Sequence, residues 1–455
     1  MMRYLLAAAA LLAPVPALAQ TAQGALDARY DRALAAGYKA LMLCGAIANA
    51  ERAGAMRTPE SVMAWELTEI QAPLDEIVAD MPYEIARYDP QPGEGKGQVR
   101  SVAVEWAEDM PPRLATHDSQ RGCAIQPIFG AGDPVVTLRP PTRGDIDWPT
   151  AADSALKQEV GRAFGAEYGE GARTTGVVVL LRGQAVAERY AQDFGPDTPQ
   201  RTWSVAKSLA ATLVGAAVAR GEADVQASAN LGAHAGDPRR AISIDHLLRM
   251  GSGRYSDTPG NRTDPLYFGG STVEETALHW PLIHAPGSVY RYANNDTLAA
   301  VKAIDGTLAD HPPAALFARL GMHDTVAEAD WQGDYVLSSQ VWSTARDLAR
   351  LGQLYLDDGV LPSGQRILPE NWVEYVSSPA GPQPEGEFGY GAGFWLFDES
   401  DGVPADTFAA MGNRGQYVVI VPSRDVVIVR RGEDPPGSGF EIATFTRDVL
   451  AALEN

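Results

Sequence analysis

The chain has little of several residue types that carry chemistry, with two cysteines, five lysines and seven histidines among its 455 residues. No two histidines have the H-x-x-H or H-x-x-x-H spacing of metal sites, so we expect no metal. His246 is interpreted as a packed or capping residue rather than a ligand. The chain has 37 lysines and arginines against 58 aspartates and glutamates. The resulting formal charge of -21 argues against nucleic acid or an anionic membrane surface as a partner. After residue 20 no segment looks long and apolar enough to span a bilayer.

The first 20 residues have the features of a secretory signal peptide. A short basic start ending at Arg3 precedes an apolar stretch over residues 5–12, and Ala17-Leu18-Ala19 forms an A-x-A cleavage site. We therefore expect residues 1–19 to be a signal peptide cleaved after Ala19. The mature protein should then be periplasmic or secreted.

The two cysteines, Cys44 and Cys123, suit an oxidising compartment. An even pair far apart in the sequence usually forms a bridge there, so we predict a disulfide between Cys44 and Cys123. The alternative is two separate buried thiols. Neither cysteine has a matching set of histidine and aspartate, which argues against a cysteine nucleophile.

The segment Ser204-Val205-Ala206-Lys207 opens an apolar run and predicts a nucleophile with its base. Residues three apart on a helix share one face, and the N–H groups at a helix start suit an oxyanion. A buried lysine loses solvation, so its pKa falls and it can accept the proton of Ser204. The alternative is a helix-capping serine followed by a lysine that reaches solvent. A second S-x-x-K, Ser154 to Lys157, lies among charged residues and predicts only a surface helix.

Tyr292-Ala293-Asn294 follows a Pro-Gly turn and precedes a helical stretch over residues 297–304. A tyrosine near a lysine cation is pushed toward phenolate and can pass a proton to a leaving group. Asn294 can orient Lys207 and bind a substrate carbonyl. The alternative is a loop tyrosine and a turn asparagine.

These motifs, in this order, resemble those of the serine β-lactamase-related hydrolases. That family includes class C β-lactamases, low-molecular-mass DD-peptidases, certain esterases and 6-aminohexanoate-oligomer amide hydrolases. The resemblance covers roughly residues 150–455 and includes three further segments, at residues 246–253, 345–352 and 415–422. It implies that Ser204 is acylated, that Lys207 is its base, and that Tyr292 relays the proton with support from Asn294.

One departure from the family concerns the K-T-G or H-x-G triplet of the strand beside the cleft. Our alignment puts Thr407-Phe408-Ala409 there, with no cation to hold a substrate carboxylate. This favours an ester or amide without such a carboxylate. The N–H of Ala410 or Met411 could complete an oxyanion hole with that of Ser204. Arg414, in a G-x-x-G-Q turn, is interpreted as a surface residue rather than a cation of the site.

The remaining pattern predicts an α+β protein with two domains. Periodic apolar residues indicate a helix over residues 24–54, and residues 99–106 alternate like a strand, so residues 20–140 should form a small N-terminal α/β domain of open role. A linker follows at residues 140–149. For residues 141–455 we expect the β-lactamase/transpeptidase-like fold, an antiparallel sheet flanked by helices plus an all-α lobe.

Within this second domain the sequence pattern predicts a helix over residues 151–168. It also predicts strand hairpins at residues 176–190 and 416–430 and a single strand over residues 391–397.

The prediction is therefore an exported serine hydrolase acting on a small-molecule ester or amide, without cofactor, nucleic acid or membrane span. One alternative is a penicillin-recognising DD-peptidase or β-lactamase. Another is a non-catalytic cell-envelope binding module on the same fold, although such a module has no chemical need for Ser204, Lys207 and Tyr292 together. A Ser-His-Asp enzyme is disfavoured because no G-x-S-x-G elbow follows a strand.

Overall fold

The computed structural model describes residues 15–90, 96–130, 154–255 and 263–454. Its largest sheet has seven strands, and every neighbouring pair is antiparallel. From one edge to the other, the strands are β10 (Gly389–Tyr390), β11 (Trp395–Leu396), β12 (Phe408–Gly412), β13 (Gln416–Val421), β14 (Val426–Gly432), β5 (Thr174–Leu181) and β6 (Gln184–Tyr190). The two hairpins predicted at 176–190 and 416–430 are confirmed.

The single strand predicted over residues 391–397 is wrong. The chain forms two very short strands there, β10 and β11, which pair with each other. Gly393 has φ of +82° and the N–H of Gly391 donates to the carbonyl of Phe394, so the segment turns back where the sequence pattern continues.

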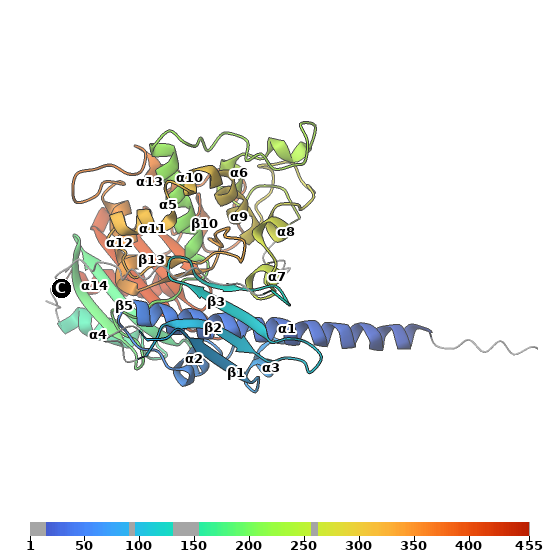
Figure 1. Ribbon diagram of the computed structural model, residues 1–455. Helices are drawn as coiled ribbons and strands as arrows, with labels where there is room; N and C mark the ends of the chain where they lie inside the picture. Colours follow the sequence, from blue (N-terminus) through green and yellow to red (C-terminus); the bar gives the residue numbers. More distant parts are fainter. Residues whose placement is uncertain (1–14, 91–95, 131–153, 256–262, 455) are drawn as a thin grey trace, which may run out of the picture.

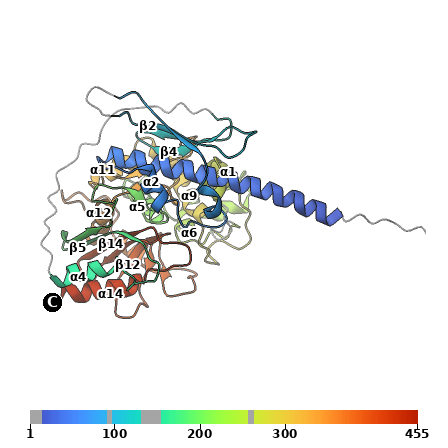
Figure 2. The same ribbon diagram turned by 90° about the horizontal axis from the view of Figure 1, so that it is seen from below.

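Alternate side chains of the sheet enter two different apolar layers, as the two-residue period of a strand requires. Val177 and Val179 of β5 face α4 (Ser154–Arg162) and α14 (Ile442–Leu453), which lie together on one face in Figure 2. Val178 and Leu180 face the opposite layer, which contains α5 (Val205–Ala219) and α12 (Ala345–Leu356). The predicted helix 151–168 is shorter than expected, because α4 ends at Arg162.

A helical lobe packs beyond α5, as predicted (Figure 1). Strand β7 (Gln200–Arg201) leads into α5. It belongs to a small sheet with the order β7, β9 (Val341–Ser343) and β8 (Val326–Ala327), which connects it to this lobe. The helices of the lobe are α6 (Ile244–Leu248), α7 (Asp264–Tyr267), α8 (Val273–Ala277), α9 (Asn294–Ala303), α10 (Asp305–Leu308), α11 (Pro313–Arg319) and α13 (Trp372–Ser377).

The N-terminal domain is built on one long helix, α1 (Val15–Arg52), which lies beside a four-stranded antiparallel sheet (Figure 1). The strands, in sheet order, are β1 (Tyr83–Arg87), β2 (Val99–Val104), β3 (Arg113–Asp118) and β4 (Gly122–Ile125), and two short helices, α2 (Pro59–Trp65) and α3 (Asp75–Val78), precede them. The predicted disulfide joins Cys44 of α1 to Cys123 of β4. The predicted boundary at residue 140 lies outside the described residues.

Helix α1 corrects one expectation, because its stretch Thr21–Arg52 is long and apolar enough to cross a membrane by length and composition. In the folded protein 94% of its apolar window is buried, so this stretch is a core helix covered on all sides. The expected cleavage point after Ala19 falls inside α1, and residues 1–14 lie outside the described part. Leu26 and Tyr30, near the start of the predicted helix, are 60% and 48% exposed.

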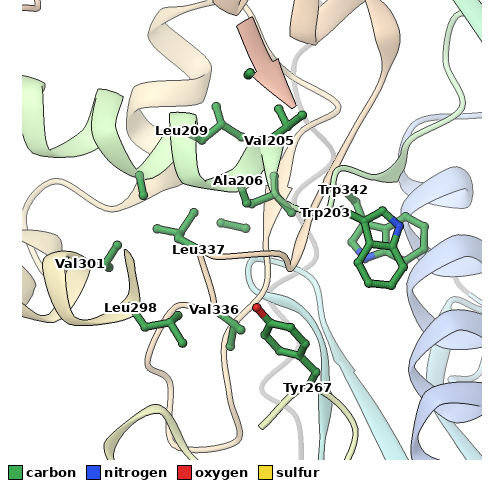
Figure 3. Close-up of a cluster of buried hydrophobic side chains, with 14 of the residues drawn as sticks. Trp203, Val205, Ala206, Leu209, Tyr267, Leu298, Val301, Val336, Leu337 and Trp342 are labelled. Atoms are coloured by element: carbon green, nitrogen blue, oxygen red, sulfur yellow. The ribbon is translucent and has the colours of Figure 1, made fainter. Parts of the chain in front are cut away.

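The N-terminal domain and the remaining part of the chain, residues 154–454, share one hydrophobic core. A single cluster of buried residues contains Leu41 of α1 and Leu209 of α5. Gly45 allows a close approach: a Cβ there would lie 2.5 Å from the ring of Trp342, which stands beside α1 in Figure 3. The N–H of Cys123 also donates to Glu328 Oε1 of the helical lobe at 3.0 Å. The two parts of the chain therefore cannot move independently without opening this core.

Removing the disulfide should destabilise the protein. It closes a separation of 79 residues, so the double variant Cys44→Ala/Cys123→Ala should lose about 2–4 kcal/mol of unfolding free energy. Urea denaturation measures this loss. As a control, a reducing agent should lower the stability of the wild type by a similar amount and leave the variant unchanged. Equal stability of the two proteins would contradict the expectation.

Candidate active site

Ser204 lies directly before α5, where the chain enters the helix in an unusual conformation. Trp203 has φ of +50°, a left-handed conformation that is rare for a bulky residue and is found most often at functional sites. The Ser204 side chain forms no capping hydrogen bond with the helix, which contradicts the alternative of a helix-capping serine. Ser204 instead lines a cavity of about 570 Å³.

Lys207 is buried one turn further along α5, with its amine at the Ser204 hydroxyl. Lys207 Nζ lies 2.9 Å from Ser204 Oγ, 2.6 Å from Asn294 Oδ1 and 3.1 Å from the carbonyl oxygen of Ser338. The predicted contact between Asn294 and Lys207 is therefore present. Asn294 is fixed in turn by its Nδ2, which donates to Thr263 Oγ1 at 2.9 Å.

Burial lowers the pKa of Lys207 to about 7. No carboxylate among the described residues forms an ion pair with this amine, so nothing offsets the loss of solvation. A neutral amine can donate to Asn294 Oδ1 and the Ser338 carbonyl while its lone pair accepts the hydroxyl proton of Ser204. The three neighbours of Lys207 Nζ thus suit both of its protonation states.

Tyr292 completes the cluster from the segment before α9. It lines the same cavity as Ser204, with which its phenol interacts, and the centre of its ring lies 4.8 Å from Lys207 Nζ. The predicted motif at 246–253 supports this segment: the carbonyl of Met250 accepts from the N–H of Arg291, and its sulfur from the N–H of Ala293. The structure thus brings together four predicted residues from two distant parts of the chain.

The expectation that the lysine pushes Tyr292 toward phenolate is wrong. Burial raises the pKa of Tyr292 well above its usual value, and the bond with Ser204 offsets only part of this shift. The rings of Tyr390 and Trp395, at 6.0 and 5.4 Å, surround it with apolar groups. Because burial lowers the pKa of Lys207 to about 7, the amine carries only part of a positive charge near neutral pH and does little to stabilise a phenolate. The phenol remains a proton donor.

The end of strand β12 borders Ser204, a few residues later than the sequence alignment suggested. Met411, Gly412 and Asn413 line the cavity, whereas Ala410 is fully buried and does not. A Cβ on residue 412 would lie 2.4 Å from the Thr202 carbonyl and 3.0 Å from the Ser204 nitrogen, so glycine is required. In this register Ala410-Met411-Gly412 replaces Thr407-Phe408-Ala409 as the triplet, and it too contains no cation.

Most lining residues of the cavity were not predicted from the sequence, and two of them, Asp264 and Gln71, bear on what the cavity can bind. Asp264, at the start of α7, and Gln71, from the N-terminal domain, both line it. Burial raises the pKa of Asp264 to about 6. Neither lies in a motif: Asp264 follows a glycine- and asparagine-containing loop, and Gln71 is some 130 positions from Ser204 in the printed sequence. Only the folded chain brings them to Ser204.

Three smaller sequence interpretations can be compared with the structure. Arg414 is not a surface residue, because it is 5% exposed and forms an ion pair with the buried Glu433. His246 caps α6, where its Nδ1 accepts from the N–H of Ser243, as its capping interpretation requires. Lys157 of the second S-x-x-K motif is exposed on α4, as predicted.

The sheet, the helical lobe and the cluster at Ser204 together match one known class of protein. The family model for beta-lactamase matches residues 160–451, which is more than half of the chain. The chain therefore belongs to the beta-lactamase family of hydrolases.

Individual relatives agree with this assignment. A 6-aminohexanoate-dimer hydrolase from Paenarthrobacter ureafaciens is 28% identical over 291 residues, which cover 57% of this chain and 73% of the relative. A solved structure from Bacillus anthracis, assigned as a 6-aminohexanoate-dimer hydrolase, aligns with a TM-score of 0.56 at 21% identity and covers 68% of this chain and 87% of that one. A mutant class C beta-lactamase aligns with a TM-score of 0.51 at 14% identity, over 66% and 98% of the two chains. The β-lactamase/transpeptidase-like fold is thereby confirmed.

The Lys207 amine should titrate near pH 7. It should be protonated below about pH 7 and neutral above it, because its pKa in the folded protein is lowered. With only five lysines, nitrogen NMR of protein labelled at the lysine side chains can resolve each one. Lys207→Gln assigns the resonance, and Lys157→Gln is the matched control on the surface. A Lys207 resonance that titrates near the ordinary value of about 10.4 would contradict the expectation.

Proposed function

We propose that the protein is an exported serine hydrolase that cleaves an ester or amide through an acyl-enzyme on Ser204. The observation that carries this proposal is the 2.9 Å contact between the Ser204 hydroxyl, which opens into a cavity, and a buried amine of pKa about 7. A hydroxyl is a weak nucleophile unless a neighbouring base removes its proton. Lys207 supplies that base without an aspartate or histidine.

In the proposed reaction, Ser204 Oγ attacks the substrate carbonyl while its proton passes to Lys207 Nζ, directly or through Tyr292. The tetrahedral intermediate collapses when the bond to the leaving group breaks, and the leaving oxygen or nitrogen takes a proton from Tyr292, which Lys207 re-protonates. Water then attacks the acyl-enzyme, and its proton returns by the same path. A protonated Tyr292 suits this role because it must donate a proton to the leaving group.

The negative charge of the intermediate needs donors that are fixed beforehand. We infer that the N–H of Ser204 and that of Asn413 supply them, in place of Ala410 or Met411. The N–H of Ser204 has no acceptor in the described part of the chain. Asn413 follows Gly412, whose missing side chain leaves room next to that N–H. Backbone N–H donors require no particular side chain at these positions.

The cavity favours a neutral or positively charged substrate. None of its described lining residues is lysine or arginine, and Asp264 is the one carboxylate among them. Trp203, Tyr267, Phe268 and Trp395 provide apolar surface for an aliphatic or aromatic chain. The relative named for the 6-aminohexanoate dimer supports an amide, and an amine-bearing substrate would fit beside Asp264.

Export is supported by two features of the N-terminal region. The disulfide between Cys44 and Cys123 is of a kind that persists in oxidising compartments. The first 20 residues, which lie mostly outside the described part, have the pattern of a signal peptide.

Ser204→Ala should abolish hydrolysis of p-nitrophenyl esters and of linear amide dimers, together with covalent labelling by a fluorophosphonate. Residual activity should be no more than the small contribution of binding and oxyanion stabilisation. Ser154→Ala, in the other S-x-x-K motif, is the matched control and should remain active and labelled. Labelling that persists in Ser204→Ala would mean that another serine is the nucleophile. Stable acylation of Ser204 by a fluorescent penicillin, or turnover of nitrocefin, would instead favour the DD-peptidase or β-lactamase alternative.

Asp264→Asn should reduce the preference for substrates that carry an amine. We expect the ratio of kcat/KM for p-nitrophenyl 6-aminohexanoate to that for p-nitrophenyl hexanoate to fall about tenfold, since an ion pair contributes about 1.5 kcal/mol more than its neutral counterpart. In the wild type the same ratio should decline as the pH falls through about 6, where Asp264 becomes protonated. Asp310→Asn, an exposed change far from the cavity, is the control. An unchanged ratio would remove Asp264 from substrate recognition.

A further inference from the structure

The segment that follows α2 in the N-terminal domain reaches the catalytic cavity. Gln71 lines this cavity, while every other lining residue comes from position 203 or later. The side-chain amide of Gln71 has no hydrogen-bond partner in the described part of the chain. Gln71 is half-buried at the cavity, so its amide can form hydrogen bonds with a molecule bound there.

Arg414 holds this segment in place from the catalytic side. Its guanidinium donates to the carbonyl oxygens of Trp65, Thr68 and Glu69 at 2.9, 3.1 and 2.7 Å. The same guanidinium is paired with Glu433 at 2.5 Å. Arg414 belongs to the turn that begins at Gly412, next to Ser204. The docking of residues 65–69 is thus directly connected to the proposed oxyanion side of the cavity.

A second arginine, Arg173 just before β5, holds the same segment. Arg173 Nη2 donates to the carbonyl of Ala64 at 2.7 Å, and its guanidinium stacks 4.6 Å from the ring centre of Trp65. The other side of Trp65 meets the ring of Phe194 edge-on at 5.1 Å. The contacts of Arg414, Arg173 and Phe194 fix residues 64–69 to the part of the chain that contains Ser204. Gln71, two residues further on, therefore has a defined position.

The N-terminal domain also supports the part of the cavity wall that Phe268 forms. Phe268 lines the cavity, and its ring lies 4.7 Å from that of Tyr38 in α1. A Cβ on Gly37 would lie 1.9 Å from the Phe268 carbonyl oxygen, so α1 passes in direct contact with this wall. Arg113 Nη2 donates to the same carbonyl at 3.3 Å. Two walls of the cavity therefore depend on the N-terminal domain.

We propose that the N-terminal domain is part of the substrate site, and that Gln71 is a specificity-determining residue. Gln71 hydrogen-bonds a neutral polar group of the substrate, an amide or a hydroxyl, at some distance from the bond that is cleaved. A glutamine amide both donates and accepts, which suits a neutral amide better than a charged group. This inference rests on the proposed function, because it concerns the same cavity.

The test compares two esters that differ by one amide. The substrates are p-nitrophenyl hexanoate and the p-nitrophenyl ester of N-acetyl-6-aminohexanoate. Gln71→Ala should lower the ratio of kcat/KM for the amide-bearing ester to that for the plain ester by about three- to tenfold, the usual value of one neutral hydrogen bond. The change should appear mainly in KM, because the amide is remote from the reacting atoms.

Two further variants separate recognition from packing. Gln71→Met keeps the approximate volume of the side chain and removes its amide, so it should reduce the ratio as much as Gln71→Ala does. Gln158→Ala, the same change at an exposed position of α4, should leave the ratio as in the wild type. A ratio within twofold of the wild type for both Gln71 variants, or full recovery in Gln71→Met, would overturn the role of Gln71.

Failure of this inference can be distinguished from failure of the proposed function. If the wild type hydrolyses both esters and Ser204 is labelled by a fluorophosphonate, an unchanged ratio counts against Gln71 alone. If the wild type hydrolyses neither ester and Ser204 remains unlabelled, the proposed function is wrong and the inference falls with it.

Discussion

The burial of one amine determines how the rest of the site is arranged. Lys207 is 1% exposed on a helix whose neighbouring residues are almost all apolar. A charged ammonium without an ion-pair partner is costly in such a place, so the neutral form gains population. The amine still needs acceptors for its N–H groups, and Asn294 Oδ1 and the Ser338 carbonyl provide them. The lone pair of the neutral amine is left to face the hydroxyl of Ser204, whose proton it can accept.

These acceptors come from separate parts of the helical lobe, so the site depends on how that lobe packs against α5. Figure 3 shows Val205, Ala206 and Leu209 of α5 in the same apolar cluster as Leu298 and Val301 of α9. Because α9 begins at Asn294, its packing on α5 sets the position of the amide that contacts Lys207. The pKa of the amine and the stability of this core are consequently linked.

The sequence reveals those parts of the site that lie within short motifs. Ser204 and Lys207 share one helical turn, and Tyr292 and Asn294 flank one residue, so local spacing was enough to predict them. The position of Gly412 beside Ser204 was missed, because the register of a strand relative to a helix is set by tertiary packing that no local pattern records. Gln71 and Asp264 were missed because tertiary packing, and no local motif, brings them to the cavity. Arg414 was misjudged because its three carbonyl partners belong to a segment almost 350 positions earlier in the sequence.

The N-terminal domain is better understood as a component of the catalytic fold than as an attached module. A module joined only by a linker could adopt many positions, and any residue it contributed to a cavity would be poorly placed. Here α1 fills the same core as α5, and Trp342 packs directly on Gly45. The guanidinium of Arg414 joins residues 65–69 to the turn beside Ser204. Removing the domain would thus expose an apolar core, leave Arg414 without its carbonyl partners and open one wall of the cavity, so catalysis and stability should depend on it together.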